Sequence, residues 1–351
     1  MMNALPVSVL TGFLGSGKTT LLNRLIKSGK LADTAFIINE FGDVGIDHLL
    51  VEQVDEGIVE LSDGCLCCTI RSDLVDTLTR LLDLDAGAPA RIVIETTGLA
   101  DPAPVLHALM AHPTLSQKLR LDGVITTVDA VNGVATLNVH EEAVKQVAMA
   151  DRLVVTKTDL AEAADQMKRL RSLNPTAHIV EEKADFADLF DCGIYNPTTK
   201  TADVARWLGE EAAKDEHHHH HHDVNRHDAR IRAFTLASDD AVDSVTLTGF
   251  LDLLRAAHGP NLLRVKGIVR LKDDPGRPVV IHGVQQVFHP PIQLPDWPDE
   301  DRRTRLVMIT RDLSEEFVSR LFDAFAGKSR IDTPDRAAIT ENPLAVPGLK
   351  L

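Results

Sequence analysis

The chain has 351 residues, of which 44% are hydrophobic and 25% are charged, and its formal net charge is −15. This length and apolar content suffice for two domains, each with its own core. The net negative charge excludes a protein that binds the phosphate backbone of a nucleic acid. The absence of a long apolar run excludes a segment that spans a membrane.

Strand-like and helix-like segments alternate through the first part of the chain. Strands are predicted at the apolar runs near 5–10, 35–39, 91–95, 121–128 and 152–156. Helices are predicted near 18–28, 71–83, 102–110, 139–149 and 160–172. This order predicts an α/β fold for residues 1–200, in which a mostly parallel sheet carries helices on both faces.

The pattern changes beyond residue 200. A charged, histidine-rich linker is predicted for 201–228, and a mobile tail for 329–351. Between them, strands are predicted near 231–237, 262–271, 278–288 and 304–310, with a helix near 246–257. A last helix is predicted to bury one face, formed by Leu313, Phe317, Leu321 and Phe325. Residues 229–328 are therefore expected to form a smaller α+β domain with an antiparallel sheet.

Residues 12–19 match the phosphate-loop pattern G-x-x-x-x-G-K-[ST], between a predicted strand and a predicted helix. The glycines permit tight turns that aim backbone N–H groups at phosphates. Lys18 is predicted to reach the outer phosphates, and the Thr19 hydroxyl to bind Mg²⁺. The predicted nucleotide contacts in this loop are Gly12, Gly15, Ser16, Gly17, Lys18, Thr19 and Thr20.

Two further segments fit a nucleotide site. Glu95 ends an apolar strand and is predicted to hold the Mg²⁺ shell, while the amide of Gly98 is predicted to sense the terminal phosphate. Residues 156–159 read T-K-T-D, so Thr156, Lys157 and Asp159 are predicted to bind guanine. The Asp159 carboxylate would accept from the base N1–H and the exocyclic amine, a donor pair that adenine lacks. The expected nucleotide is therefore GTP.

Cys65, Cys67 and Cys68 form a second kind of site, because clustered thiolates suit Zn²⁺ or Cu(I), and Co²⁺ also accepts them. Cys65 and Cys67 are predicted to bind the ion together, with Cys68 as an optional third ligand. Two or three ligands leave the tetrahedron incomplete, which suits an ion that must be released. A redox dithiol and a buried cysteine cluster are the alternatives.

Several polar residues carry no firm assignment. Glu40 and Asp43 follow the second predicted strand, where they either reach a metal or form a solvated turn. The six histidines 217–222 favour local metal capture, with an inert linker as the alternative. His107 and His112 are interpreted as surface histidines.

The chain resembles the CobW-type GTPases, which are grouped with metallochaperone GTPases of hydrogenase and urease maturation. The matching stretches are 11–20, 39–42, 64–68, 94–102, 128–130 and 156–159, with 263–267 and 281–284 resembling the C-terminal domain of the family. Two positions depart from the pattern. Thr156 stands where GTPases usually carry Asn, and Ile38 where some relatives carry an acidic residue, so a metal site that uses position 38 does not transfer.

The resemblance implies a cytoplasmic enzyme that converts GTP to GDP and phosphate and delivers a transition metal, expected to be zinc, to a client metalloprotein. Lys18, Thr19 and Glu95 would carry catalysis, and turnover would be slow because no arginine finger is evident. A homodimer remains an open alternative. The competing functions are cobalt delivery for cobalamin synthesis, a passive zinc reservoir, and a small-molecule kinase.

Overall fold

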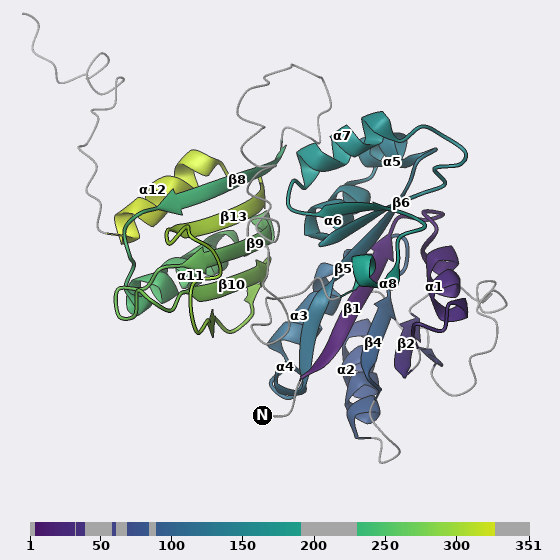
Figure 1. Ribbon diagram of the computed structural model, residues 1–351, viewed down its shortest axis with the longest axis horizontal. Coiled ribbons are helices and arrows are strands. Elements are labelled where there is room, and N and C mark those ends of the chain that lie inside the picture. Colours follow the sequence, from purple (N-terminus) through teal and green to yellow (C-terminus); the bar gives the residue numbers. More distant parts are fainter. Residues whose placement is uncertain are drawn as a thin grey trace, which may run out of the picture.

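Two β-sheets organise the molecule, one in each of two domains (Figure 1). The computed structural model describes residues 4–31, 33–38, 58–60, 69–83, 89–190 and 230–326. In Figure 1 the first domain runs from purple to teal and the second from green to yellow. Within the described ranges, no helix is both long and apolar enough to cross a bilayer.

The first domain holds a seven-stranded parallel sheet in the order β3-β2-β4-β1-β5-β6-β7. Its strands are β1 (Leu5–Gly12), β2 (Thr34–Ile38), β3 (Ile58–Glu60), β4 (Arg91–Glu95), β5 (Leu119–Asp129), β6 (Arg152–Thr156) and β7 (His178–Glu181). Its helices are α1 (Lys18–Lys27), α2 (Thr69–Leu82), α3 (Ala103–Ala111), α4 (Leu115–Lys118), α5 (Gly133–Val139), α6 (Glu141–Met149), α7 (Ala164–Leu173) and α8 (Phe186–Leu189).

Helices cover both faces of this sheet, which is why its strands are continuous apolar runs. In β6, Leu153 and Val155 belong to an apolar cluster that includes residues of α2, α3, α6 and α7, whereas Val154 belongs to a second cluster with residues of α1. The predicted α/β class and the helices on both faces are confirmed. The strand β7 is short and only partly buried, so its apolar signal was too weak to predict it.

The second domain holds a six-stranded sheet in which β11, β10, β9, β13 and β8 lie in that order and β12 pairs with β10. Its strands are antiparallel: β8 (Ile231–Ser238), β9 (Leu262–Val269), β10 (Val279–Val284), β11 (Val287–Phe288), β12 (Ile292–Gln293) and β13 (Thr304–Arg311). Two long helices, α11 (Ser244–His258) and α12 (Glu315–Phe325), cover one face, and a short 3-10 helix, η4 (Gly259–Asn261), follows α11. The predicted smaller antiparallel domain is confirmed.

The buried face of α12 differs from the prediction at one position. Val318 and Phe322 are buried against the sheet, whereas Phe317 is 43% exposed and contacts the ring of His258. The helix begins at the cap Ser314, whose hydroxyl accepts from the Phe317 amide. Leu313 therefore precedes the helix and does not set its phase. Leu313 is buried and Leu321 and Phe325 pack against the same core, so the predicted face is wrong at Phe317 alone. The predicted linker 201–228 and tail 329–351 lie outside the described residues, so the proposed domain boundaries remain predictions.

The second face of the antiparallel sheet packs against the first domain. Ile231, Leu263, Val284 and Ile309 are buried in the same apolar cluster as residues of α3, α6 and α7. All eight residues of β9 are buried, since one face meets α11 and α12 and the other meets the first domain. This contact fixes how the two sheets sit relative to each other.

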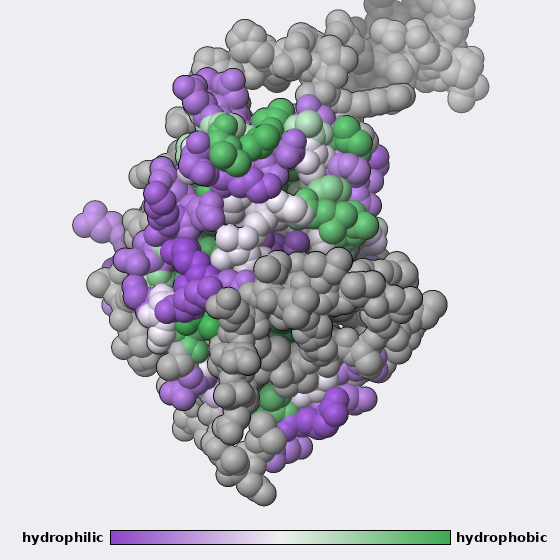
Figure 2. Space-filling view, turned by 90° about the vertical axis from the view of Figure 1, so that its right-hand side faces the viewer, coloured by the Kyte–Doolittle hydropathy of each residue, from purple (hydrophilic) through white to green (hydrophobic). Residues whose placement is uncertain are grey.

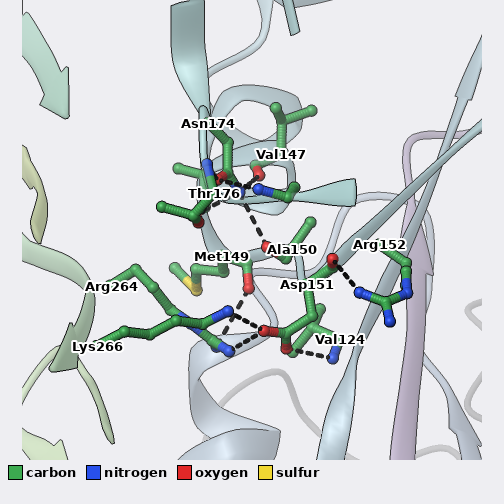
Figure 3. A network of polar contacts seen from close by, with 12 residues as sticks. Val124, Val147, Met149, Ala150, Asp151, Arg152, Asn174, Thr176, Arg264 and Lys266 are labelled. Atoms are coloured by element: carbon green, nitrogen blue, oxygen red, sulfur yellow. Dashed lines mark hydrogen bonds and ion pairs between the residues drawn. The ribbon is translucent and has the colours of Figure 1, made fainter. Parts of the chain in front are cut away.

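A buried ion cluster lies at this contact (Figure 3). Asp151 lies directly before β6 and forms an ion pair with Arg264 on β9 of the second domain. The Oδ1 atom of Asp151 also lies 2.9 Å from the Nζ atom of Lys266, on the same strand β9. The backbone amide of Val124 donates to the other carboxylate oxygen at 2.9 Å. Burial alone would raise the pKa of Asp151, but the two cations hold it well below its ordinary value. Removing one partner from such a buried pair costs about 3–5 kcal/mol.

His282 on β10 lies beside this cluster, paired in register with Lys266. It is 3% exposed, and within the described part of the chain neither ring nitrogen has a hydrogen-bond partner. Burial first, and then the positive charge of Arg264, hold the pKa of His282 well below its usual range, although Asp151 acts in the opposite direction. The imidazole is therefore neutral in the folded protein at pH 7.

Replacing His282 with leucine should flatten the dependence of stability on pH. The unfolded chain binds a proton at this histidine near pH 6.5 and the folded chain does not, so stability falls as the pH drops below about 6.5, by at most about 1.4 kcal/mol per unit. The melting temperature of His282→Leu should fall less than that of wild type between pH 7.5 and 5.5. His258→Leu is the control, and equal slopes in wild type and His282→Leu would contradict this assignment.

Candidate nucleotide site

Parallel strands bring the predicted nucleotide residues to one edge of the first sheet. β1 pairs with β4 and β5, and β5 pairs with β6, so that Leu10 lies opposite Glu95, and Asp129 opposite Thr156. The loops that follow these four strands therefore meet at the carboxyl edge of the sheet. Such an edge is where open α/β sheets bind ligands.

The loop from β1 to α1 has the backbone that its glycines require. Gly12, Gly15 and Gly17 have φ values of 143°, 70° and 92°, in the region that favours glycine. A Cβ atom at Gly12 would lie 2.3 Å from the hydroxyl oxygen of Thr127 and 2.5 Å from its carbonyl oxygen, so no side chain fits. The Ser16 hydroxyl lies 2.6 Å from the Thr127 hydroxyl and ties the loop to β5.

Lys18, Thr19 and Glu95 lie together at the mouth of this loop. The Lys18 ammonium group donates to the Gly12 carbonyl at 3.0 Å and lies 3.4 Å from that of Phe13. The Thr19 hydroxyl lies 3.3 Å from a carboxylate oxygen of Glu95, whose side chain is buried. A hydroxyl and a carboxylate are hard oxygen ligands, so this pair fits Mg²⁺.

Gly98 packs directly on the phosphate loop. A Cβ atom there would lie 2.7 Å from the backbone nitrogen of Leu14 and 2.8 Å from its Cα. The preceding segment is held against β1, because the Thr96 hydroxyl donates to that of Thr11 at 2.8 Å. Gly98 therefore lies beside the amides that the phosphate-loop pattern assigns to the phosphates.

The segment after β6 braces the phosphate loop from the other side. The Thr156 hydroxyl donates to the Ser16 carbonyl at 2.7 Å, so threonine supplies a loop contact here although GTPases usually carry Asn. The Lys157 ammonium group donates to the Gly15 carbonyl at 2.8 Å. Asp159 is exposed at the same edge, and so is Thr20 in the first turn of α1.

Asp129, at the end of β5, received no role from the sequence beyond its place in a matching stretch. Its carboxylate accepts from Lys157 at 3.1 Å and from the amides of Val131 and Asn132 at 2.8 and 2.6 Å. Partial burial would raise the pKa of Asp129, but these contacts lower it overall, so the group is ionised at pH 7. Asp129 thus fixes Lys157 over the loop.

The predicted thiolate ligands Cys65, Cys67 and Cys68 lie outside the described residues, as do Glu40, Asp43 and the histidines 217–222. Among the residues that the structure describes, no group of three or more His, Cys, Asp or Glu side chains has the arrangement of a metal site. His107 and His112 are half-buried on and just after α3, and His112 accepts from the Leu115 amide at 3.4 Å.

Exposed apolar side chains follow the same strand ends. Leu14 is 59% exposed after β1, Leu99 is 56% exposed after β4, and Leu160 is 69% exposed after β6. Val131 and Val134, after β5, are 50% and 41% exposed. In Figure 2, which shows the side of the molecule on the right of Figure 1, apolar residues form separate green groups between polar ones.

A phosphate loop after β1, an acid at the end of β4 and a K-x-D segment after β6 define a phosphate-loop nucleotide-binding protein. Residues 6–181 match the family model described as "CobW/HypB/UreG, nucleotide-binding domain", and residues 231–326 match "Cobalamin synthesis protein cobW C-terminal domain". The chain belongs to the CobW/HypB/UreG family, and the class of enzyme is a GTPase.

Named relatives extend over most of the chain. The zinc chaperone YjiA of Escherichia coli (strain K12) is 34% identical over 333 residues, covering 93% of this chain and 99% of the relative. The zinc chaperone CobW of Pseudomonas aeruginosa is 29% identical and covers 90% of each chain. The zinc-regulated GTPase metalloprotein activator 1 of Schizosaccharomyces pombe is 33% identical over 55% of this chain and 50% of its own length.

Solved structures agree with the fold of both domains. The crystal structure of Zn(II)-bound YjiA GTPase from E. coli superposes with a TM-score of 0.62 at 27% identity, covering 92% of this chain and 99% of the other. A Zn(II)-bound triple mutant of the same protein gives a TM-score of 0.66 at 26% identity over the same coverage. The predicted resemblance to CobW-type GTPases is confirmed.

Thr156→Val should weaken the binding of all nucleotides alike, because valine keeps the shape of threonine but removes the hydrogen bond to the Ser16 carbonyl. The expected loss is about 1 kcal/mol, or roughly fivefold in affinity. Asp159→Asn is the comparison variant, since it should instead shift preference from GTP toward xanthosine triphosphate. Titration of both variants with both nucleotides measures this, and a selective loss of GTP in Thr156→Val would contradict the loop-bracing role.

Proposed function

We propose that this protein hydrolyses GTP to load or release zinc, which it delivers to a client metalloprotein. The observation that carries the proposal is the convergence of Lys18, Thr19, Glu95 and Asp159 on one sheet edge, in a chain whose relatives are named zinc chaperones. The site residues, the zinc cargo and the client are parts of this proposal.

Hydrolysis would depend on positioning and on charge compensation. The Lys18 ammonium group and the backbone amides of 15–20 offset the charge that builds up on the transferring phosphoryl group. The loop backbone is held by Thr127 and Thr156, so these donors are arranged before the substrate arrives. GTPases that lack an arginine finger turn over at roughly 10⁻⁴ to 10⁻³ per second, which is the range we expect.

Magnesium would be held by the Thr19 hydroxyl and the Glu95 carboxylate, directly or through water. When bound, the ion neutralises charge on the β- and γ-phosphates. Glu95 is buried behind the phosphate loop at the end of a central strand, so its position does not depend on a loop. The protein therefore contributes a fixed carboxylate to a site that the substrate completes.

Guanine would be selected by Asp159, with Lys157 packed beneath the base. Lys157 is held in a left-handed conformation, with φ of 56°, and by its contacts to Gly15 and Asp129. The backbone amide of Lys157 also donates to Glu182 at 3.0 Å. These contacts hold the segment before Asp159 in place, so the carboxylate can discriminate between bases without a large rearrangement.

Zinc is the cargo, and Cys65, Cys67 and Cys68 are its proposed ligands. Thiolates bind this ion tightly, and an incomplete ligand set permits transfer to another protein. Exposed apolar side chains after four strands, among them Leu14 and Leu99, lie near the nucleotide edge, where a client can contact them. Relatives named for zinc favour this metal over cobalt. The alternative function, which the experiment on zinc affinity below tests, is a passive zinc reservoir.

Lys18→Ala should abolish GTP hydrolysis and leave the fold intact, because the ammonium group acts on the charge of the bound nucleotide. Its contacts with the Gly12 and Phe13 carbonyls lie within the phosphate loop and outside the apolar core. We expect at least a hundredfold loss of turnover, with an unchanged circular dichroism spectrum. Lys27→Ala, at the far end of the same helix, is the control. Retained turnover in Lys18→Ala would rule out the assigned catalytic site.

Zinc and GTP should bind cooperatively if the nucleotide gates the cargo. Typical coupling corresponds to roughly 5–150-fold in affinity, and linkage requires the same factor in both directions. Competition with a chromophoric zinc chelator should give tighter zinc binding with a non-hydrolysable GTP analogue than with GDP. Cys65→Ala and Cys67→Ala should lose this difference. Equal zinc affinity in both nucleotide states would instead support the passive reservoir.

A further inference from the structure

Helix α6 lies between the nucleotide edge and the second domain. It packs on β1 and β5 of its own sheet and on β9 of the second domain (Figure 1). The Thr126 hydroxyl on β5 donates to the Gln146 carbonyl at 3.0 Å, which fixes the helix against the central strand. Side chains from this one helix therefore reach two parts of the molecule that do not adjoin in sequence.

One set of contacts holds the segment 98–101. The side-chain amide of Gln146, which is 1% exposed, donates to the Gly98 carbonyl at 3.2 Å and to the Ala100 carbonyl at 3.0 Å. The Lys145 ammonium group lies 3.4 Å from the Asp101 carboxylate. Gly98 itself packs on the backbone of the phosphate loop. A nucleotide-dependent shift of this segment would therefore displace the carbonyl groups that Gln146 holds.

A second set of contacts holds the second domain. Glu141, in the first turn of α6, pairs with Arg311 at the end of β13, and it lies 3.7 Å from Lys145. The carbonyl of Met149, in the last turn, accepts from the Arg264 guanidinium at 3.3 Å. Asp151, two residues further on, pairs with Arg264 and Lys266 (Figure 3). Both ends of the helix are thus tied to the second domain.

The polar contacts form a continuous path. It runs from Arg311 through Glu141 and Lys145 to Asp101, three residues after Gly98, which packs on the phosphate loop. The buried Gln146 amide makes a parallel connection through the helix to Met149 and Arg264. Gln146 and Arg264 are buried, whereas the ion pairs of Lys145 and Glu141 are partly exposed. One helix thus carries contacts to the segment 98–101 and to the second domain.

We propose that α6 couples the nucleotide state to the second domain, with Gln146 and Lys145 as positioning residues for the segment 98–101. The coupling rests on the proposed GTPase cycle, in which the terminal phosphate reorders the segment that contains Gly98. It is reciprocal, so contacts at Arg311 and Arg264 alter the relative affinities for GTP and GDP. A client that binds the second domain would act on GTP turnover by this route.

The test measures two quantities in the full-length protein. One is the ratio of affinities for a non-hydrolysable GTP analogue and for GDP. The other is the difference in amide hydrogen exchange of residues 231–311 between the two nucleotide states. A purely structural role would lower stability and leave both quantities unchanged.

Gln146→Met keeps the bulk of the side chain and removes both donors, and Glu141→Gln removes the charge that faces Arg311. Each should change the affinity ratio at least threefold and abolish the exchange difference in the second domain, while both nucleotides still bind. Glu142→Gln is the matched control. The Glu142 carboxylate, next to Glu141 on the same helix, forms no ion pair within the described residues, so its neutralisation should leave both quantities at wild-type values. Lys145→Met, at a partly exposed position, gives the same test if Gln146→Met does not fold.

Two results separate this proposal from the proposed function. If wild-type protein hydrolyses GTP but its second domain exchanges equally in both states, or if Gln146→Met and Glu141→Gln both retain the difference, the coupling through α6 is wrong and the GTPase assignment stands. If wild-type protein binds no GTP, both proposals fail.

Discussion

The close approach of β1 to β5 at Gly12 is the constraint on which the nucleotide site depends. The Gly12 backbone lies against the carbonyl and hydroxyl of Thr127, where any side chain would collide with both oxygen atoms. This contact lets the chain leave β1 and turn at once into the phosphate loop. The ends of β4 and β6 sit at the same level of the sheet, so Glu95 and Thr156 reach the loop without long connections. The site is a property of the sheet edge more than of any one loop.

The sequence predicted the parts of this molecule that local patterns encode. The phosphate loop was predicted because its glycines and lysine lie within eight consecutive residues, and the central strands because their apolar runs are buried on both faces. The roles of Asp129 and Gln146 were not predictable, because each depends on a partner that only the folded sheet brings close. Phe317 was misassigned because the helix phase was counted from Leu313, which precedes the cap.

The charged residues at the domain contact also could not be assigned from the sequence, because their partners are distant in the chain. Arg264 and Lys266 alternate with apolar residues along β9, a pattern typical of a strand with one solvated face. Both are instead buried against Asp151. Arg264 and Asp151 are 113 residues apart in the sequence. The cost of burying three charges is offset by their pairing and by the Val124 amide. Such an arrangement specifies the docking position of the second sheet more strictly than apolar packing alone would.

The long separation between Asp151 and its partners also sets an order of events during synthesis. The first domain can begin to fold once its sheet has left the ribosome, while β9 still awaits translation. During that interval the Asp151 carboxylate and the apolar surfaces of α3, α6 and α7 lack the sheet that later covers them. At about 5–20 residues per second, the delay between Asp151 and Arg264 is roughly 6–23 s. Cellular chaperones therefore have a defined surface and a defined time window in which to protect the nascent chain.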